Sequence, residues 1–297
     1  MPRENLIGEY LRARRELVRP EDIGVHDIGG RRRVAGLRRS EVALLAGVST
    51  EYYVRLEQGR DQHPSPQVLD ALARALQLDE YATAHLHLLA NTPTARRRKG
   101  PRTEKAPARI VQLIQSWTET PAFVEGRYTD VLAANSLATA LAPHYAVGTN
   151  LVRATFLDPG LREMYDNWEA ISESAVAALR ALVGHDVDDP RLTELVGELS
   201  VRCERFRQLW ARHDVRPKRS GWARLTHPIV GPLDLRYEKF PIPNTDSQTL
   251  GVYHAEPGSP SAQALALLAD EGHARRPSAT SGARRTRPRP VFRTDRA

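Results

Sequence analysis

Three polar side chains between residues 49 and 60 stand at a spacing suited to contacting DNA bases. Glu51 and Arg55, four residues apart, fall on one face of a helix that begins at about residue 49 (STEYYVRLEQGR), and Thr50 stands in its first turn. An arginine guanidinium can donate two hydrogen bonds to O6 and N7 of a guanine, and a glutamate can accept one from a cytosine amino group. The segment therefore predicts hydrogen bonding to base edges in a major groove.

Further groups around this segment have the chemistry that holds a DNA backbone. Basic side chains, hydroxyl and amide groups, and the first N–H groups of a helix all bind phosphate. Contacts of this kind position a protein on DNA and make binding dependent on salt, without reading sequence. The residues expected to contact phosphates are Arg38, Arg39, Ser49, Tyr52, Gln58 and Arg60.

Two helices must position these side chains. Apolar residues at helical spacing predict a first helix over about 37–46 and a second over about 49–58. Gly47 suits a left-handed turn between them because it lacks a Cβ, and Ser49 is expected to cap the second helix. Spacing, turn and cap together predict a helix-turn-helix.

The stretch LRRSEVALLAGVSTEYYVRLEQGR at residues 37–60 resembles the helix-turn-helix domains of the phage-repressor type, the XRE family. A two-helix hairpin could be merely structural. However, the continuation through PSP into another amphipathic helix extends the resemblance over about residues 6–90. It implies a DNA-binding domain. It also implies that Glu57 pairs with an arginine of the first helix, with Arg15 as the first choice and Arg14 as the second.

The N-terminal block as a whole predicts five short helices. A longer connection, 18–36, separates the first helix from the second, and its Arg31–Arg33 run fits an arm along a groove or a solvated loop equally well. The helices are expected at Leu6–Leu17, from Leu37, from Ser49, after the cap Ser65 with Pro66 at the first helical position, and after the cap Asp79.

Charge divides the chain into modules. Lys and Arg number 19 against 14 Asp and Glu over residues 1–105, 16 against 20 over 106–270, and 8 against 2 over 271–297. Basic ends around an acidic centre are typical of a protein with one module that faces a polyanion. We expect a helix-turn-helix domain over 1–95, a basic linker over 96–107, a second domain over 108–270 and a disordered basic tail over 271–297.

Strand and helix patterns are mixed in the second domain. Two short strands flank a turn at Gly126 and precede a helix capped near Asn135. Two amphipathic helices follow, then three antiparallel strands centred on 233–237, and a last helix over Ser261–Leu268. This order predicts a PAS-like sensor. The fold class is therefore multidomain, with an all-α five-helix helix-turn-helix domain followed by an α+β PAS-like domain.

Segments such as TPAFVEGRYTDVLAAN and HPIVGPLDLRYE resemble the ligand-binding domain of MmyB-like regulators over about residues 108–270. The resemblance implies a pocket for fatty-acid-like or other hydrophobic small molecules. Ala134 stands where relatives usually carry tryptophan, so the identity of the effector does not carry over. Aromatic residues also fit plain core. The expected lining residues are Trp117, Phe123, Asn135, Arg153, Trp168, Phe206, Leu209 and Trp210.

Catalytic and metal chemistry lack their usual motifs. His85 and His87 point to different faces of a helix, and the acids at 186–189 lack the glycine and closing glutamate of a calcium loop. There is no nucleophile elbow, phosphate loop or zinc motif. Cys203 is the single cysteine, so no internal disulfide forms. We expect no enzyme activity, no cofactor and no metal.

The interpretation that these observations favour is a homodimeric transcription regulator that binds a double-stranded DNA operator and responds to a fatty-acid-like effector. No stretch approaches the roughly 18 apolar residues of a membrane helix, so we expect no membrane association and a cytoplasmic location. One alternative is a DNA-binding adaptor whose C-terminal domain binds protein. Another is an enzyme acting on nucleic acid, against which the missing catalytic constellation speaks.

Overall fold

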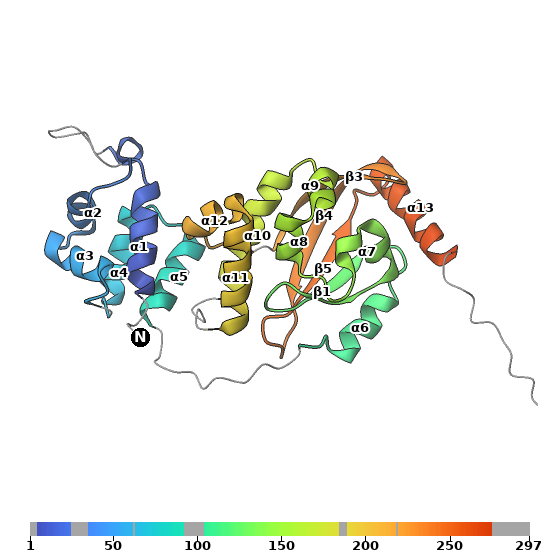
Figure 1. Cartoon of the computed structure of the whole chain (residues 1–297), viewed down its shortest axis with the longest axis horizontal. Helices are drawn as coiled ribbons and strands as arrows, with labels where there is room; N and C mark the ends of the chain where they lie inside the picture. Colours follow the sequence, from blue (N-terminus) through green and yellow to red (C-terminus); the bar gives the residue numbers. More distant parts are fainter. Residues whose placement is uncertain are drawn as a thin grey trace, which may run out of the picture.

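The computed structural model describes residues 5–24, 35–61, 63–91, 104–183, 189–217 and 219–274. Figure 1 shows a helical N-terminal domain beside a C-terminal domain built on one β-sheet, as the fold class predicted. The Arg31–Arg33 run, most of the expected linker and residues 275–297 lie outside the described residues. No described helix is long and apolar enough to cross a bilayer.

The N-terminal domain consists of the helices that the sequence predicted, and the cap residues lie as expected. Side chains of Ser49, Ser65 and Asp79 each accept a hydrogen bond from the backbone N–H three residues on. Its elements are α1 (Leu6–Leu17), the 3-10 turn η1 (Pro20–Ile23), α2 (Arg39–Ala46), α3 (Thr50–Glu57), α4 (Pro66–Ala75) and α5 (Glu80–Ala90).

The start of α2 differs slightly from the prediction. Leu37 was expected to be helical, but the helix begins at Arg39, and Leu37 is instead fully buried with its N–H donating to the carbonyl of Arg15. The turn after α2 is as predicted: Gly47 has a φ of 67°, the left-handed conformation that glycine adopts without a steric penalty. Tyr53 and Leu56 seal α3 onto the core, since both are fully buried.

The C-terminal domain contains one antiparallel five-stranded sheet with the strand order β2-β1-β5-β4-β3. The predicted N-terminal hairpin and the predicted three-stranded unit are therefore parts of the same sheet, because β5 pairs with β1 as well as β4. The strands are β1 (Ala122–Glu125), β2 (Val131–Ala134), β3 (Ser220–His227), β4 (Gly231–Pro241) and β5 (Thr249–His254).

Helices cover both faces of this sheet. Helices α7 and α13 pack on the face that carries Phe123 and Tyr237, and α6 packs on the opposite face against Val124. A separate apolar cluster joins α8, α10, α11 and α12 around Phe206. The bounds are α6 (Ala108–Gln115), α7 (Ser136–Leu141), the 3-10 turn η2 (Pro143–Tyr145), α8 (Leu151–Leu157), α9 (Pro159–Met164), α10 (Trp168–Val183), α11 (Pro190–Arg202), α12 (Glu204–Ala211) and α13 (Pro260–Ala274).

Helix α13 extends beyond the predicted end of the last helix and past the predicted domain boundary at 270. The first four residues of the expected disordered tail thus continue a helix. The polar residues after Leu268 hid this continuation, because they break the apolar pattern on which the prediction rested.

Candidate DNA-binding surface and ligand cavity

The three side chains predicted to read bases are open to solvent. Thr50, Glu51 and Arg55 are exposed on α3, while Tyr53 and Leu56 on its other side are fully buried. The Arg55 guanidinium lies 3.7 Å from the Glu51 carboxylate and 5.7 Å from the centre of the Tyr52 ring. An exposed pair of this kind is weak, so both groups are free to turn toward a base edge.

The residues predicted to contact phosphates surround the same helix. Ser49, Arg39, Gln58 and Arg60 are exposed, and Arg38 and Tyr52 are half-buried. The Ser49 hydroxyl accepts the N–H of Tyr52, so it caps α3 at the end where a phosphate would meet the helix dipole. Basic and polar groups therefore border the exposed side of α3 at both its ends.

A buried carboxylate fixes α3 to the rest of the domain. One oxygen of Glu57 accepts from Arg15 Nε and the other from Arg39 Nε, both at 2.6 Å, and the Glu57 side chain is only 1% exposed. Burial alone would raise the pKa of Glu57, but hydrogen bonds from Arg15 and Arg39 outweigh it and hold the pKa below its ordinary value. Glu57 is thus ionised and supports α3 from behind.

The structure distinguishes the two arginines that the sequence left open. Arg15 binds Glu57, whereas Arg14 binds Asp214 of the C-terminal domain at 2.6 Å. Arg39, expected only at a phosphate, is the second partner of Glu57, although its side chain remains 46% exposed. It therefore links the domain core to the candidate DNA surface.

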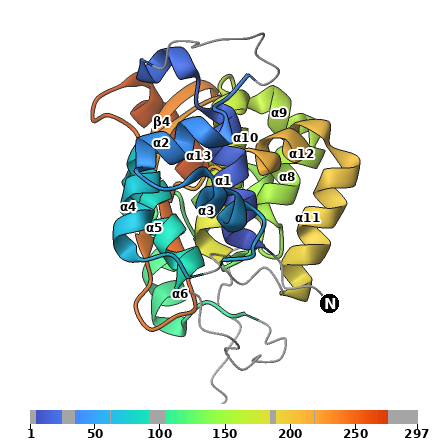
Figure 2. The ribbon, with the colours of Figure 1, turned by 90° about the vertical axis from the view of Figure 1, so that its left-hand side faces the viewer.

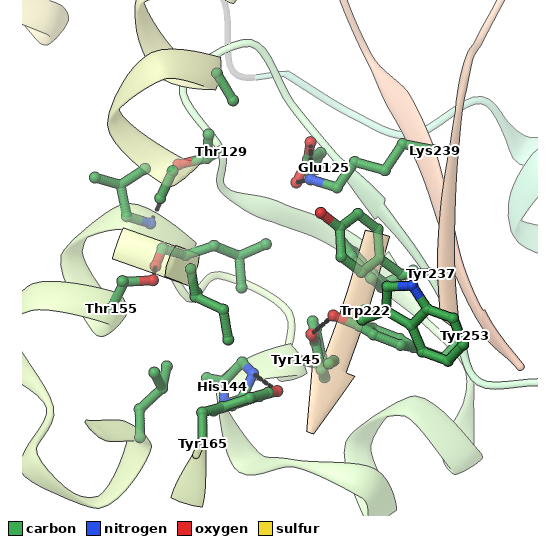
Figure 3. A pocket seen from close by; sticks show the side chains of 18 residues that line it. Glu125, Thr129, His144, Tyr145, Thr155, Tyr165, Trp222, Tyr237, Lys239 and Tyr253 are labelled. Carbon is green, nitrogen blue, oxygen red and sulfur yellow. Dashed lines mark hydrogen bonds and ion pairs between the residues drawn. The ribbon is translucent and has the colours of Figure 1, made fainter. Parts of the chain in front are cut away.

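The C-terminal domain contains a cavity of about 70 Å³ between the sheet and the helices α8, α9 and α10. Figure 3 shows how side chains from β1, β4 and β5 face those from η2, α8 and α9 across it. Most of its wall is aromatic or aliphatic, which suits a hydrophobic ligand. The polar and aromatic residues labelled there are Glu125, Thr129, His144, Tyr145, Thr155, Tyr165, Trp222, Tyr237, Lys239 and Tyr253.

An ion pair lies at one end of the cavity. Lys239 Nζ donates to both oxygens of Glu125 at 2.5 and 2.6 Å, and Thr249 Oγ1 donates to the same carboxylate at 2.8 Å. The side chains of Glu125 and Lys239 are nearly excluded from water, with exposed fractions of 3% and 12% respectively. A buried pair keeps the cavity close to neutral, so a ligand there meets hydrogen-bonding groups without an unbalanced charge.

Aromatic hydroxyl groups supply hydrogen bonds along the wall. The hydroxyls of Tyr145 and Tyr253 lie 2.6 Å apart, and the Tyr165 hydroxyl is 3.2 Å from His144 Nε2. Burial raises the pKa of Tyr165 and of Tyr237 to about 12 and those of Tyr145 and Tyr253 well above the ordinary value. These phenols therefore keep their protons and can donate to a ligand oxygen.

Of the eight residues predicted to line a pocket, only Phe123 lies on this cavity wall. Phe206, Leu209 and Trp210 pack in the helical cluster, and Trp168 packs beside the cavity with its indole N–H donating to the carbonyl of Thr155. Their apolar side chains build core.

The remaining predicted lining residues also serve elsewhere. Asn135 caps α7, and its amide nitrogen donates to the carbonyls of Ile114, Trp117 and Thr120. Arg153 pairs with Glu198 on the surface. Trp117 borders an open groove beside Phe240 on the other face of the sheet. None of them is therefore available as an anchor in the cavity.

The prediction missed the charged and tyrosine residues of the cavity, although the strands carried a signal for two of them. Lys239 continues the inward alternation of Leu233, Leu235 and Tyr237, and Glu125 lies two residues after the inward Phe123. A charged residue at an inward strand position requires a buried partner. No comparable signal marked His144, which reaches the cavity from the 3-10 turn η2, or Tyr165, which follows α9 and forms an isolated β-bridge with Leu225.

No described group of three or more His, Cys, Asp or Glu side chains is placed to hold a metal ion. Comparison with known families gives two matches, one for each domain. Residues 106–268 match the MmyB-like transcription regulator ligand binding domain, and residues 6–86 match a helix-turn-helix domain. No curated protein matches the chain. The two resemblances seen in the sequence are thereby confirmed, in the order predicted.

Proposed function

Because the chain belongs to the family of MmyB-like transcription regulators, we propose that it binds a double-stranded DNA operator as a homodimer and that a hydrophobic effector in the C-terminal cavity modulates this binding. A cytoplasmic location is part of this proposal, since the proposed partner is DNA. The exposed α3 carries the first part of the proposal, since Thr50, Glu51 and Arg55 are open to solvent while Glu57 anchors the helix from behind.

In the proposed complex the first turn of α3 enters the major groove. Arg55 donates to a guanine and Glu51 accepts from a cytosine, while Arg38, Arg60 and the N-terminus of α3 hold phosphates. A homodimer would place two such helices about 34 Å apart and so read a near-palindromic site.

Selection of bound sequences from a random DNA library with the full-length protein tests this part. The expected result is a pair of inverted half-sites with centres separated by about 10 bp or a multiple of it. Binding without any sequence preference, and with a steep salt dependence only, would contradict sequence reading and leave a nonspecific DNA-binding adaptor.

The size and chemistry of the cavity limit the effector. A cavity of about 150 Å³ holds benzene in another protein, so 70 Å³ is too small for a fatty acid unless a wall moves. Aromatic walls and tyrosine hydroxyls favour a hydrophobic molecule with oxygen atoms. Mass spectrometry of the native full-length protein tests for a copurified molecule. Melting temperatures measured with added decanoic acid and with a simple phenol compare two effector classes, fatty acids and phenols. If no compound of either class raises the melting temperature, the proposed effector class is wrong.

A further inference from the structure

A short segment of the C-terminal domain, Arg212–Arg216, forms the contact with the helix-turn-helix domain. Val215 is buried among the apolar side chains of the helix-turn-helix core. On either side of it, Asp214 accepts from Arg14 at 2.6 Å, and Arg216 donates to Asp79 at 3.1 Å. Figure 1 shows α1 and α5 on the side of the helix-turn-helix domain nearest α12, and Figure 2 is viewed from the side of the helix-turn-helix domain. We call this segment the docking segment.

Two arginines near the docking segment have only part of their hydrogen-bonding capacity used. Arg180 on α10 is 8% exposed and stacks over Trp210 with its Cζ 3.9 Å from the ring centre. Among the described residues, no carboxylate lies within salt-bridge distance of Arg180, and its Nε and that of Arg14 have no hydrogen-bond partner. Arg180 Nη2 does donate to the carbonyl of Trp210 at 2.7 Å, but a buried guanidinium without a carboxylate partner costs free energy, which weakens this contact.

Helix α10 contributes to both the cavity and the contact. Ile171, Ala175 and Ala178 line the cavity, and their spacing puts them on one face of the helix. Toward the C-terminal end of the same helix, the carbonyl of Ala177 accepts the N–H of Arg216 at 3.3 Å, and Ala181 packs against the helix-turn-helix core. A single helix therefore separates the cavity from the DNA-binding domain.

A ligand as large as benzene does not fit the cavity unless part of its wall moves. The cavity holds about 70 Å³, less than half of the roughly 150 Å³ that accommodates a benzene ring. Strands β1, β4 and β5 are each paired on both sides within the sheet, which makes their wall rigid. Helix α10 lines the cavity mainly with small alanine side chains, and its C-terminal part packs at the contact with the helix-turn-helix domain. It is therefore the part of the wall that we expect to move most easily.

From these relationships we infer that filling the cavity moves α10 against the docking segment and releases the helix-turn-helix domain from the C-terminal domain. This inference rests on the cavity being the effector site, as proposed above. The contact involves α1 and α5, whereas the DNA-facing side chains lie on α3 and are exposed. Release would therefore leave the recognition surface intact and change how rigidly the two recognition helices of a dimer are spaced.

Hydrogen exchange of full-length variants tests the inference without DNA or effector. Ala178→Leu, and independently Ala175→Leu, would fill the cavity from α10 in place of a ligand. Ala170→Leu is the matched control, because Ala170 is exposed on the same helix. We expect the amides of α1, α5 and Arg216 to exchange faster by about 5- to 150-fold in the filled variants, the range of coupling between linked sites. They should be unchanged in Ala170→Leu.

Unchanged exchange at these amides in both filled variants would overturn the inference. If neither filled variant folds, the reverse measurement decides, because coupling between two sites is reciprocal. Asp214→Asn weakens the contact from outside the cavity, and it should speed exchange of the α10 amides from Ile171 to Ala178. Arg12→Gln, at an exposed ion pair on α1, is its control. Protection of α10 that does not respond to Asp214→Asn would overturn the inference.

The readout separates this inference from the proposed function. If the native protein shows no sequence-specific DNA binding, the proposed function is wrong, but the expected exchange across the contact is unaffected. If the filled variants exchange faster across the contact but bind the operator with unchanged affinity, the domains do separate as inferred, but their separation does not regulate DNA binding.

Discussion

The carboxylate of Glu57 binds the guanidinium of Arg15 at 2.6 Å, across the 42 residues that separate them in the chain. Both side chains are buried, with 1% and 7% exposure. The pair joins the end of the recognition helix to α1, the helix that also contacts the C-terminal domain through Arg14. The position of α3 relative to the rest of the molecule therefore depends on this bond.

Removing the Glu57 carboxylate should unfold the domain more than it changes DNA specificity. Glu57→Ala leaves Arg15 buried without its carboxylate, and breaking a buried pair of this kind typically costs about 3 to 5 kcal/mol. Urea unfolding should show that loss, whereas Glu51→Ala, an exposed acid on the same helix, should change stability by no more than about 0.5 kcal/mol. An unchanged melting temperature with an altered base preference would place Glu57 at the DNA instead.

Arg55 should determine one base of each half-site. Arg55→Ala is expected to weaken operator binding by about 1 to 3 kcal/mol and to relax the preference at a single position. Arg60→Ala, at the far end of the same segment, should weaken all sequences equally and reduce the slope of log K against log salt by about 1. Repeating the sequence selection with both variants distinguishes the two roles. Uniform weakening by Arg55→Ala would make Arg55 a backbone contact.

The buried pair at the cavity should respond differently to single and double replacement. Lys239→Met leaves the carboxyl group of Glu125 in an apolar wall without its cationic partner and should cost about 3 to 5 kcal/mol in urea unfolding. The double variant Glu125→Leu, Lys239→Met replaces the pair by apolar groups and should recover most of that stability. Equal losses in both variants would mean that the loss in Lys239→Met does not come from an unpaired Glu125.

Short-range patterns in the sequence predicted much of this molecule. Gly47 and Ser49 place the turn and the cap of the helix-turn-helix, because each acts on backbone groups within four residues. The alternation of Leu233, Leu235 and Tyr237 likewise indicated β4 and its inward face. In both cases the residues and the structure they specify lie in the same segment.

Contacts between distant segments could not be predicted in the same way. The cavity joins Glu125 to Lys239 across 114 residues, and the contact between the domains joins Arg14 to Asp214 across 200. The predicted pocket residues Phe206 and Trp210 illustrate the same limit, because their aromatic character fits a core or a ligand site equally. Only the arrangement of α8, α10 and α11 around Phe206 assigns it to the core.

Acid should loosen the contact between the two domains through His213. In the docked state burial, followed by the nearby charges of Arg180, His85 and Arg14, lowers the pKa of His213 to about 3 from an ordinary value of 6.5. The docked state holds His213 neutral, whereas the undocked state can protonate it below about pH 6.5. The contribution of His213 to docking is therefore fully present above pH 6.5 and is lost progressively as the pH falls from 6.5 toward 3. The ring of Tyr10 also faces His213, at 6.2 Å between centroids, and Asp214, the next residue in the chain, pairs with Arg14 and Arg212.

The pH range above about 5 isolates this effect. The carboxylates of Glu57 and Asp79 have lowered pKa values, so they stay ionised there. Hydrogen exchange of α1 and α5 should therefore quicken, after correction for intrinsic rates, between pH 7.5 and pH 5 in the native chain. In His213→Gln, which cannot take up the proton, protection should change little over the same range. A pH response that persists in His213→Gln would assign it to His85 or to another group, and the burial of a neutral His213 would then not be what holds the domains together.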